Sequence, residues 1–187
     1  MILIGLDAVG KTTLLYSLGA HPVLVDNPGT GRVMIEAASV GGVDILSYDL
    51  GGSDAPFSDR IPPDLRPLFD GAQALLFVVD AADTARLPSA AKFLHLLLAE
   101  PALGTCPLLV FLNKQDLPNA INVTEAEAQL ALTAETVKGN RRWKIQGTCT
   151  TTREGVDEGF EWLSGAVQDP RPSLREVEHL SVEVRTA

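Results

Sequence analysis

The first residues with an evident chemical use are Gly5 to Thr12, which read GLDAVGKT and follow the apolar start of the chain. The two glycines of this pattern, G-x-x-x-x-G-K-[ST], let the backbone curl so that its amide groups point at one anion. Lys11 adds a positive charge and Thr12 a hydroxyl group. We therefore predict a phosphate-binding loop, with Lys11 at the β and γ phosphates and Thr12 on a magnesium ion.

A second candidate is the stretch DLGG, Asp49 to Gly52, which follows an apolar run ending at Tyr48. An aspartate at the end of a strand can hold magnesium, often through water, and the Gly52 amide can then contact a γ phosphate. By itself an Asp-Gly stretch is commonly only a turn. Together with the phosphate loop it predicts a metal role for Asp49, through water.

A third candidate is NKQD, Asn113 to Asp116, directly after the apolar run 108–112. The Asp116 carboxylate can accept hydrogen bonds from N1–H and the 2-amino group of guanine, a donor pair that adenine lacks. We expect Asn113 to tie loops together and the Lys114 stem to cover the base. The backbone amides of TCT, residues 148–150, could then meet guanine O6, although each stretch alone is also compatible with an ordinary polar turn.

The elements that must position these residues follow from the hydrophobic pattern. Strands are expected at 2–6, 33–35, 44–48, 75–79, 108–112 and 144–147, with a hairpin turn at Gly41 and Gly42. Helices are expected at 11–18, from Pro88 through Leu98, from a capping box of Thr124 and Glu127 through Leu132, and at 155–167. This alternation predicts an α/β fold with a mainly parallel, doubly wound sheet, whose ligands bind at the carboxyl ends of the strands.

The composition limits the classes of partner. The chain has 187 residues, with a net charge of −9, so we expect neither nucleic acid nor an anionic membrane surface as the main partner. Cys106 and Cys149 are too isolated for a disulfide framework or a zinc site, which favours buried thiols in a cytoplasmic protein. No apolar stretch reaches the length of a membrane span, and we expect a monomer without an anchor of its own.

The order and spacing of these motifs resemble the ADP-ribosylation factor family of small GTPases, the Arf and Arf-like proteins. The resemblance covers about residues 1–167, as a P-loop small-GTPase domain, and leaves 168–187 as a tail. Its most specific words are GLDAVGKTTLLY, LLFVVDAAD, LLVFLNKQDLPNA and WKIQGTCTTTREGVDEGFEWL. It implies a GTP/GDP switch with Mg²⁺, an antiparallel inter-switch hairpin strand, and a role in membrane trafficking or in organelle or cilium organisation. It also implies protein effectors, an exchange factor and an activating protein, and a cytoplasmic place, peripheral to membranes through partners.

The resemblance carries over to individual residues. The nucleotide-binding residues that it implies are Gly5, Leu6, Asp7, Ala8, Val9, Gly10, Lys11, Thr12, Thr13, Gly52, Asn113, Lys114, Asp116, Cys149 and Thr150. The metal-binding residues are Thr12, Asp49 and a threonine of the first switch loop. Counting back from Asp49 without gaps places Thr30 at that position, whereas counting from Pro28 places Gly29 there.

The chain departs from the family at several positions. Ser53 stands where the family has the glutamine that positions the attacking water, and its side chain is too short to span the same gap. The following loop is about five residues longer than usual, and either Arg60 or Arg66 matches the arginine that the family carries nearby. Thr150 replaces an alanine. The sequence also starts at the first strand, so either an upstream helix is missing from it or this member has no membrane coupling.

These observations predict a guanine-nucleotide switch with slow or impaired GTP hydrolysis. The alternative is a GTP-binding scaffold that does not cycle, which Ser53 and the altered switch loops favour. A phosphate-loop ATPase or kinase would share GLDAVGKT but would not need NKQD, so a preference for GDP over ADP separates it from the other two.

Overall fold

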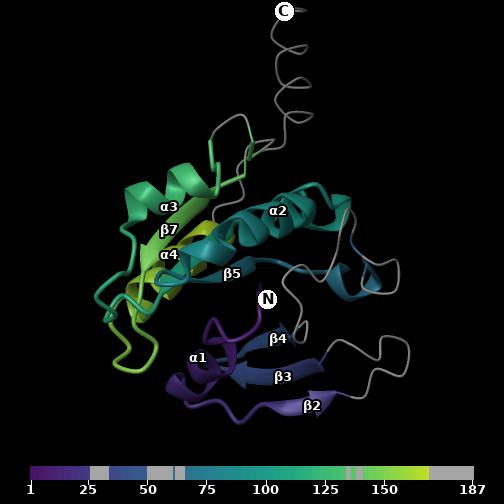
Figure 1. Ribbon diagram of the computed structural model, residues 1–187. Coiled ribbons are helices and arrows are strands. Elements are labelled where there is room, and N and C mark those ends of the chain that lie inside the picture. The colour runs from purple at the N-terminus through teal and green to yellow at the C-terminus, as the bar shows by residue number, and fades with distance from the viewer. Residues whose placement is uncertain (26–33, 50–60, 62–65, 134–135, 138–140, 169–187) are drawn as a thin grey trace, which may run out of the picture.

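A computed structural model describes residues 1–25, 34–49, 61, 66–133, 136–137 and 141–168 (Figure 1). It contains a seven-stranded sheet in the order β2-β3-β4-β1-β5-β6-β7. The strands are β1 (Ile2–Gly5), β2 (Val23–Val25), β3 (Met34–Val40), β4 (Val43–Asp49), β5 (Leu75–Asp80), β6 (Leu108–Asn113) and β7 (Trp143–Gly147). The α-helices are α1 (Lys11–Ser17), α2 (Leu87–Leu98), α3 (Val123–Gln129) and α4 (Val156–Gln168).

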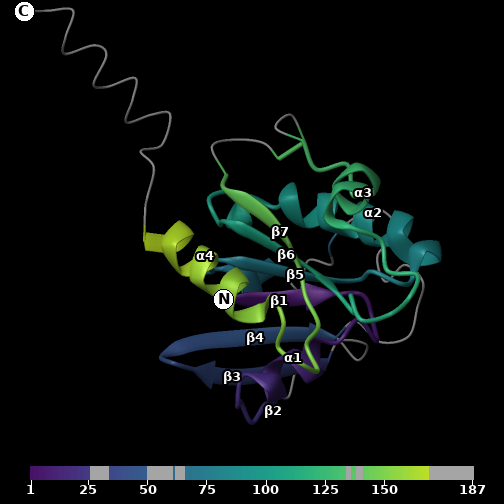
Figure 2. The same ribbon diagram turned by 90° about the vertical axis from the view of Figure 1, so that its left-hand side faces the viewer.

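The centre of the sheet is parallel. Strand β1 pairs in parallel with β4 on one side and β5 on the other, and β5–β6 and β6–β7 are also parallel pairs. Every residue of β1, β5 and β6 is buried, as expected for parallel strands that are covered on both faces. Figure 2 shows α4 on one side of the sheet and α2 and α3 together on the other. The predicted α/β fold with a mainly parallel, doubly wound sheet is therefore confirmed.

The antiparallel part lies at one edge. Strands β3 and β4 form the predicted hairpin, and the turn residues Gly41 and Gly42 both have positive φ, 57° and 82°. A two-residue hairpin turn of this kind needs positive φ at both positions, which glycine tolerates best. Strand β2 pairs antiparallel to β3 and was not predicted, because three residues between Pro22 and Asp26 are too few to show a period.

The helices pack on the sheet through apolar and aromatic contacts. Phe160 of α4 meets Phe111 of β6 edge to face at 5.7 Å between ring centroids, and Phe93 of α2 lies 5.9 Å from Phe77 of β5. Three short 3₁₀ helices, η1 (Arg66–Phe69), η2 (Thr84–Arg86) and η3 (Pro101–Leu103), complete the described elements. Cys106 and Cys149 are both free and buried, as predicted.

The predicted start of helix α3 is wrong. Its capping box is formed by Asn122 and Glu125, not by Thr124 and Glu127: the Asn122 side chain accepts from the Glu125 amide at 2.9 Å, and the Glu125 carboxylate accepts from the Asn122 amide. Asn122 has extended backbone, which is the conformation of a capping residue, and asparagine caps better than threonine. The helix ends at Gln129 and not at Leu132, because Ala131 has a positive φ of 51°, which does not continue an α-helix.

Candidate functional site

The registers of the parallel strands bring the predicted motifs to one edge of the sheet. Gly5, at the end of β1, is in register with Asp49 at the end of β4. Asp80 at the end of β5 is in register with Asn113 at the end of β6. Because parallel strands share their carboxyl ends, the loop after Gly5, the loop after Asn113 and the loop after β7 all start from this edge.

The loop from Gly5 to Lys11 connects β1 to α1 in a tight curl. Ala8 and Gly10 have positive φ, 56° and 104°. A Cβ atom on Gly10 would lie 2.4 Å from Nδ2 of Asn113, so glycine is required here for space as well as for conformation. The Lys11 side chain is buried, and its ammonium group donates hydrogen bonds to the carbonyls of Gly5 at 3.2 Å and Leu6 at 2.6 Å. The positive charge of Lys11, which the sequence predicts for this loop, therefore lies inside the curl of the loop.

Asn113 joins this loop to the loop after β7. Its Nδ2 donates to the Val9 carbonyl at 2.9 Å and to the Thr150 hydroxyl at 3.2 Å. Its Oδ1 accepts from the Thr150 amide at 3.1 Å and from the Thr148 hydroxyl at 3.4 Å. Asn113 is only 1% exposed, so each of these bonds is made away from water, where an unmade one is costly. The structure gives Asn113 the loop-tying contacts that the sequence predicts.

Lys114 connects the loop between β1 and α1 to the end of β5. Its backbone has φ 65°, and its ammonium group donates to the Ala8 carbonyl at 2.9 Å. The same ammonium lies 2.6 Å from a carboxylate oxygen of Asp80, whose other oxygen accepts from the Ala82 amide. The sequence analysis did not single out Asp80. Its position in VVDAAD, at the end of a buried strand, is the sequence feature that could have identified it as a site residue.

Arg86 is a second residue that the sequence analysis missed. It lies in η2, and its Nη1 donates to Oδ1 of Asp7 at 2.7 Å and to the Asp7 carbonyl at 3.4 Å. Its Nε donates a hydrogen bond to the Asp83 carboxylate. This hydrogen bond is the main reason why the pKa of Arg86 is raised above its ordinary value. This arginine therefore stays charged and fixes the outer side of the loop between β1 and α1.

Thr12 lies beside a carboxylate that was also not predicted. The Thr12 hydroxyl donates to Oε2 of Glu36 at 3.0 Å, from the first turn of α1 to strand β3. Asp49 ends the neighbouring strand β4 beside Gly5. Hydroxyl and carboxylate oxygens are the ligands that magnesium prefers, so the adjacent side chains of Thr12 and Glu36 fit that ion. Across the described ranges, no group of three or more His, Cys, Asp or Glu side chains could hold a metal by itself.

Four further residues that the sequence predicts for the site lie in the described part of the chain. Asp116 lies exposed in the turn after β6, two residues after Lys114. Cys149 and Thr150 are buried, and the Cys149 amide donates to the Glu154 carbonyl at 3.0 Å. Thr13 is exposed in the first turn of α1.

Several predicted residues lie outside the described part of the chain or make contacts away from the candidate site. Thr30 with its alternative Gly29, Gly52, Ser53 and Arg60 lie outside the described residues, as does the tail after Gln168. Arg66 donates from Nε and Nη2 to a carboxylate oxygen of Glu100, so its guanidinium is held at the end of α2.

In the part of the chain that the structure describes, no helix has the length and apolar character needed to cross a membrane.

Comparison with known proteins identifies the family to which the chain belongs. The model of the ADP-ribosylation factor family matches residues 1–167. The solved structure of the Arl6 BBS3 small GTPase from Trypanosoma brucei, with a bound nucleotide analogue, GppNp, is 26% identical and superposes with a TM-score of 0.67. That match covers 91% of this chain and 97% of the trypanosome chain.

The fold and the site define a small GTPase. The chain belongs to the ADP-ribosylation factor family, whose members are guanine-nucleotide-binding switches. The predicted resemblance is thereby confirmed.

Proposed function

We propose that this chain binds GTP and GDP with Mg²⁺ at the carboxyl edge of its sheet and switches protein partners according to the nucleotide. The observation that carries the proposal is the buried Asn113 side chain, which bonds to Val9 of the phosphate loop and to Thr150 of the opposite loop. The loops proposed to bind the phosphates and the base are thus joined by one side chain. The family assignment supports guanine as the base.

The phosphates would bind along residues 5–13. The curled backbone and the buried Lys11 ammonium support this assignment, because the β and γ phosphates would be counterions to that charge. Arg86 and Lys114 hold the carbonyls of Asp7 and Ala8 from outside. The loop would consequently keep its shape when the ligand leaves, which lowers the cost of ordering it on binding.

The base would lie against Lys114, with Asp116 accepting from guanine N1–H and the 2-amino group. Guanine O6 would meet the amides of Cys149 and Thr150. Since these amides already donate to Glu154 and Asn113, we infer that either contact with O6 would be a shared hydrogen bond.

The metal would be held by Thr12 directly, by Asp49 through water and by Thr30 of the first switch loop. The carboxylate of Glu36 beside the Thr12 hydroxyl adds a further hard oxygen donor. When bound, Mg²⁺ would offset the negative charge of the phosphates.

Hydrolysis would be slow. Even intrinsic hydrolysis of Ras type is on the order of 10⁻⁴ per second, and it depends on a glutamine that orients the attacking water. Ser53 stands at that position here and cannot reach as far. Arg66 is engaged by Glu100, which does not support a role for it on the transition state.

We further propose a cytoplasmic protein that reaches membranes through its partners, in trafficking or in organelle or cilium organisation. Effectors, an exchange factor and an activating protein would read the switch loops and the β3–β4 hairpin. Ser53 also favours a second function, a GTP-binding scaffold that does not cycle. Equal affinity of a partner for the GDP form and for the GTP-analogue form would support the scaffold over the switch.

Competition with a fluorescent GDP analogue tests the base assignment. GDP should displace the analogue and ADP should not, and Asp116→Ala should remove that preference. Glu158→Ala, which changes an exposed acid on α4, should bind like the unaltered chain. Displacement by ADP as effective as by GDP would overturn guanine recognition.

Single-turnover GTP hydrolysis tests the role of Ser53. The unaltered chain should hydrolyse GTP more slowly than the Ras-type rate, and Ser53→Gln should raise the rate or its response to an activating protein. A rate at or above the Ras-type value in the unaltered chain would contradict slow hydrolysis, without affecting the binding assignment.

A further inference from the structure

Thr150 places a hydroxyl group where the loop after β7 meets the loop between β1 and α1. Its Oγ1 accepts a hydrogen bond from Nδ2 of Asn113 at 3.2 Å, and the residue is only 4% exposed. The same oxygen lies 3.4 Å from the position that a Cβ atom on Gly10 would occupy. The hydroxyl group therefore lies beside both Asn113 and the backbone of the predicted phosphate loop.

The hydrogen-bonding groups around this hydroxyl are already paired, with one exception. Asn113 donates both of its Nδ2 protons, one to the Val9 carbonyl at 2.9 Å and one to Thr150. The Thr150 amide donates to Oδ1 of Asn113 at 3.1 Å. A hydroxyl group that accepts a hydrogen bond still has its own proton to donate. Among the described residues, the hydroxyl proton of Thr150 has no acceptor. Since buried donors are normally paired, this proton is available to a ligand.

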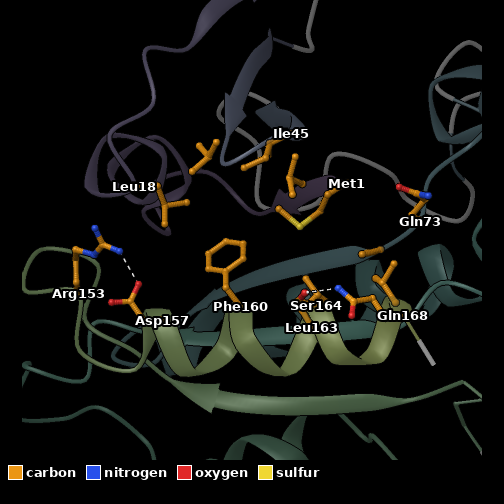
Figure 3. A pocket seen from close by; sticks show the side chains of 14 residues that line it. Met1, Leu18, Ile45, Gln73, Arg153, Asp157, Phe160, Leu163, Ser164 and Gln168 are labelled. Atoms are coloured by element: carbon orange, nitrogen blue, oxygen red, sulfur yellow. Dashed lines mark hydrogen bonds and ion pairs between the residues drawn. The ribbon is translucent and has the colours of Figure 1, made fainter.

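The loop that carries Thr150 is held on both sides. Before it, the Thr148 amide donates to a carbonyl of β6 at 3.0 Å. After it, Arg153 donates to the Ser17 carbonyl at 3.0 Å and pairs with Asp157 of α4 (Figure 3). These contacts fix the place of the Thr150 hydroxyl group without a ligand, so little ordering of the loop is needed when one binds.

The ligand side of this contact rests on the proposed function. There, Asp116 accepts from N1–H and the 2-amino group of guanine, and the amides of Cys149 and Thr150 donate to O6. The edge of guanine that carries O6 also carries N7, which is a second acceptor. Because the amide and the hydroxyl group belong to one residue, an edge that reaches the Thr150 amide also brings N7 near its hydroxyl group. One unused donor and one unused acceptor thus face the same part of the site.

We propose that the Thr150 hydroxyl group donates a hydrogen bond to N7 of the bound guanine. Asn113 then donates to Thr150 and Thr150 donates to the base, and consecutive hydrogen bonds of this kind strengthen each other. The alanine that Thr150 replaces in the family would supply neither bond. Adenine carries the same N7 acceptor, so this contact adds affinity for the nucleotide without selecting the base. The choice of guanine stays with Asp116.

The analogue 7-deaza-GDP, in which a C–H group replaces N7, tests this bond by displacement of a fluorescent GDP analogue. Loss of one buried hydrogen bond weakens binding roughly tenfold, so the unaltered chain should bind 7-deaza-GDP about tenfold more weakly than GDP. Thr150→Val removes the hydroxyl group at nearly constant volume and should bind the two nucleotides equally weakly. Thr150→Ser keeps a hydroxyl group and should keep the preference for GDP over 7-deaza-GDP.

Two further threonines provide matched controls. The Thr148 hydroxyl donates to Oδ1 of Asn113 at 3.4 Å, so Thr148→Val should weaken GDP and 7-deaza-GDP by the same factor and keep the preference between them. Thr124→Val, at an exposed position of α3, should bind both nucleotides like the unaltered chain.

The inference is overturned if the unaltered chain binds 7-deaza-GDP as tightly as GDP, a comparison that needs no variant to fold. It is also overturned if Thr150→Val keeps the preference for GDP over 7-deaza-GDP. Both of these outcomes leave the proposed function standing, since GDP still binds. Failure of the unaltered chain to bind GDP at all would overturn the proposed function and this inference together.

Discussion

The Thr12 hydroxyl donates a hydrogen bond to the Glu36 carboxylate at 3.0 Å. This contact joins the first turn of α1 to the hairpin strand β3, across 24 residues of sequence. Because Thr12 is the predicted metal ligand, the position of the hairpin and the environment of the metal are linked. A change at Glu36 should therefore be detected in the behaviour of Mg²⁺, although the residue belongs to none of the nucleotide-binding motifs.

Replacement of Glu36 by glutamine keeps the hydrogen bond from Thr12 but removes the negative charge. A charged acceptor is worth about 1 kcal/mol more than a neutral one, so the Mg²⁺ concentration for half-maximal GDP retention should rise roughly fivefold. Nucleotide release at a series of Mg²⁺ concentrations measures this shift. Glu127→Gln, at an exposed position of α3, is the control and should show no shift. The same shift in both variants would mean that Glu36 acts only through net charge.

Replacement of Gly10 by alanine should damage the site, whereas replacement of Gly19 should damage only stability. Both glycines have positive φ, 104° and 76°, so each alanine should cost about 1–2 kcal/mol in backbone strain. Only at Gly10 would the new Cβ meet the Asn113 amide, while nothing lies within 4 Å at Gly19. Displacing that amide leaves the Val9 carbonyl without its partner, at about 1–3 kcal/mol, so GDP affinity should fall about tenfold or more.

Thermal melting and GDP titration of the two glycine variants separate these effects. Both variants should melt at a lower temperature, and only Gly10→Ala should bind GDP weakly. Equal affinities in the two variants would show that the contact of Gly10 with Asn113 does not matter for the ligand.

Removal of the Arg86 side chain should weaken nucleotide binding through the phosphate loop. Arg86 pairs with Asp7 of that loop, and a partly exposed ion pair contributes about 0.5–1 kcal/mol, which corresponds to roughly a two- to fivefold loss of GDP affinity in Arg86→Ala. Arg66→Ala removes a comparable pair with Glu100, at the end of α2, and should leave GDP affinity unchanged. Isothermal titration of both variants measures the difference, and an equal loss in both would count against a local role for Arg86.

The buried Tyr48 predicts a loss of stability at high pH. Burial raises the pKa of Tyr48 to about 12 from its ordinary value of 10. The folded protein therefore keeps the phenolic proton where the unfolded chain has already lost it. The contribution of Tyr48 is complete below about pH 10 and falls as the pH rises to about 12. Urea unfolding of Tyr48→Phe should show a smaller fall over this interval than the unaltered protein, and parallel curves would refute the assignment.

Local patterns determined much of this protein. Three features could be predicted because each depends only on neighbours in the sequence. They are the glycines and lysine of GLDAVGKT, the apolar runs that form β1, β5 and β6, and the Gly41–Gly42 turn. The capping box of α3 was placed two residues late, since Thr124 with Glu127 and Asn122 with Glu125 satisfy nearly the same local rule. The choice between them depends on where the preceding loop enters the helix, which local pattern does not specify.

The identity of the family was also determined by the sequence alone, because the motifs occur in a fixed order along the chain. Only the tertiary structure decided which residues support those motifs. Asp80, Arg86 and Glu36 contact the candidate site through Lys114, Asp7 and Thr12, respectively. Each pair is separated by at least 24 residues, and it meets only because parallel strands bring their carboxyl ends to one edge and β3 lies beside α1. A contact that depends on strand order leaves no periodic or short-range signal in a single sequence.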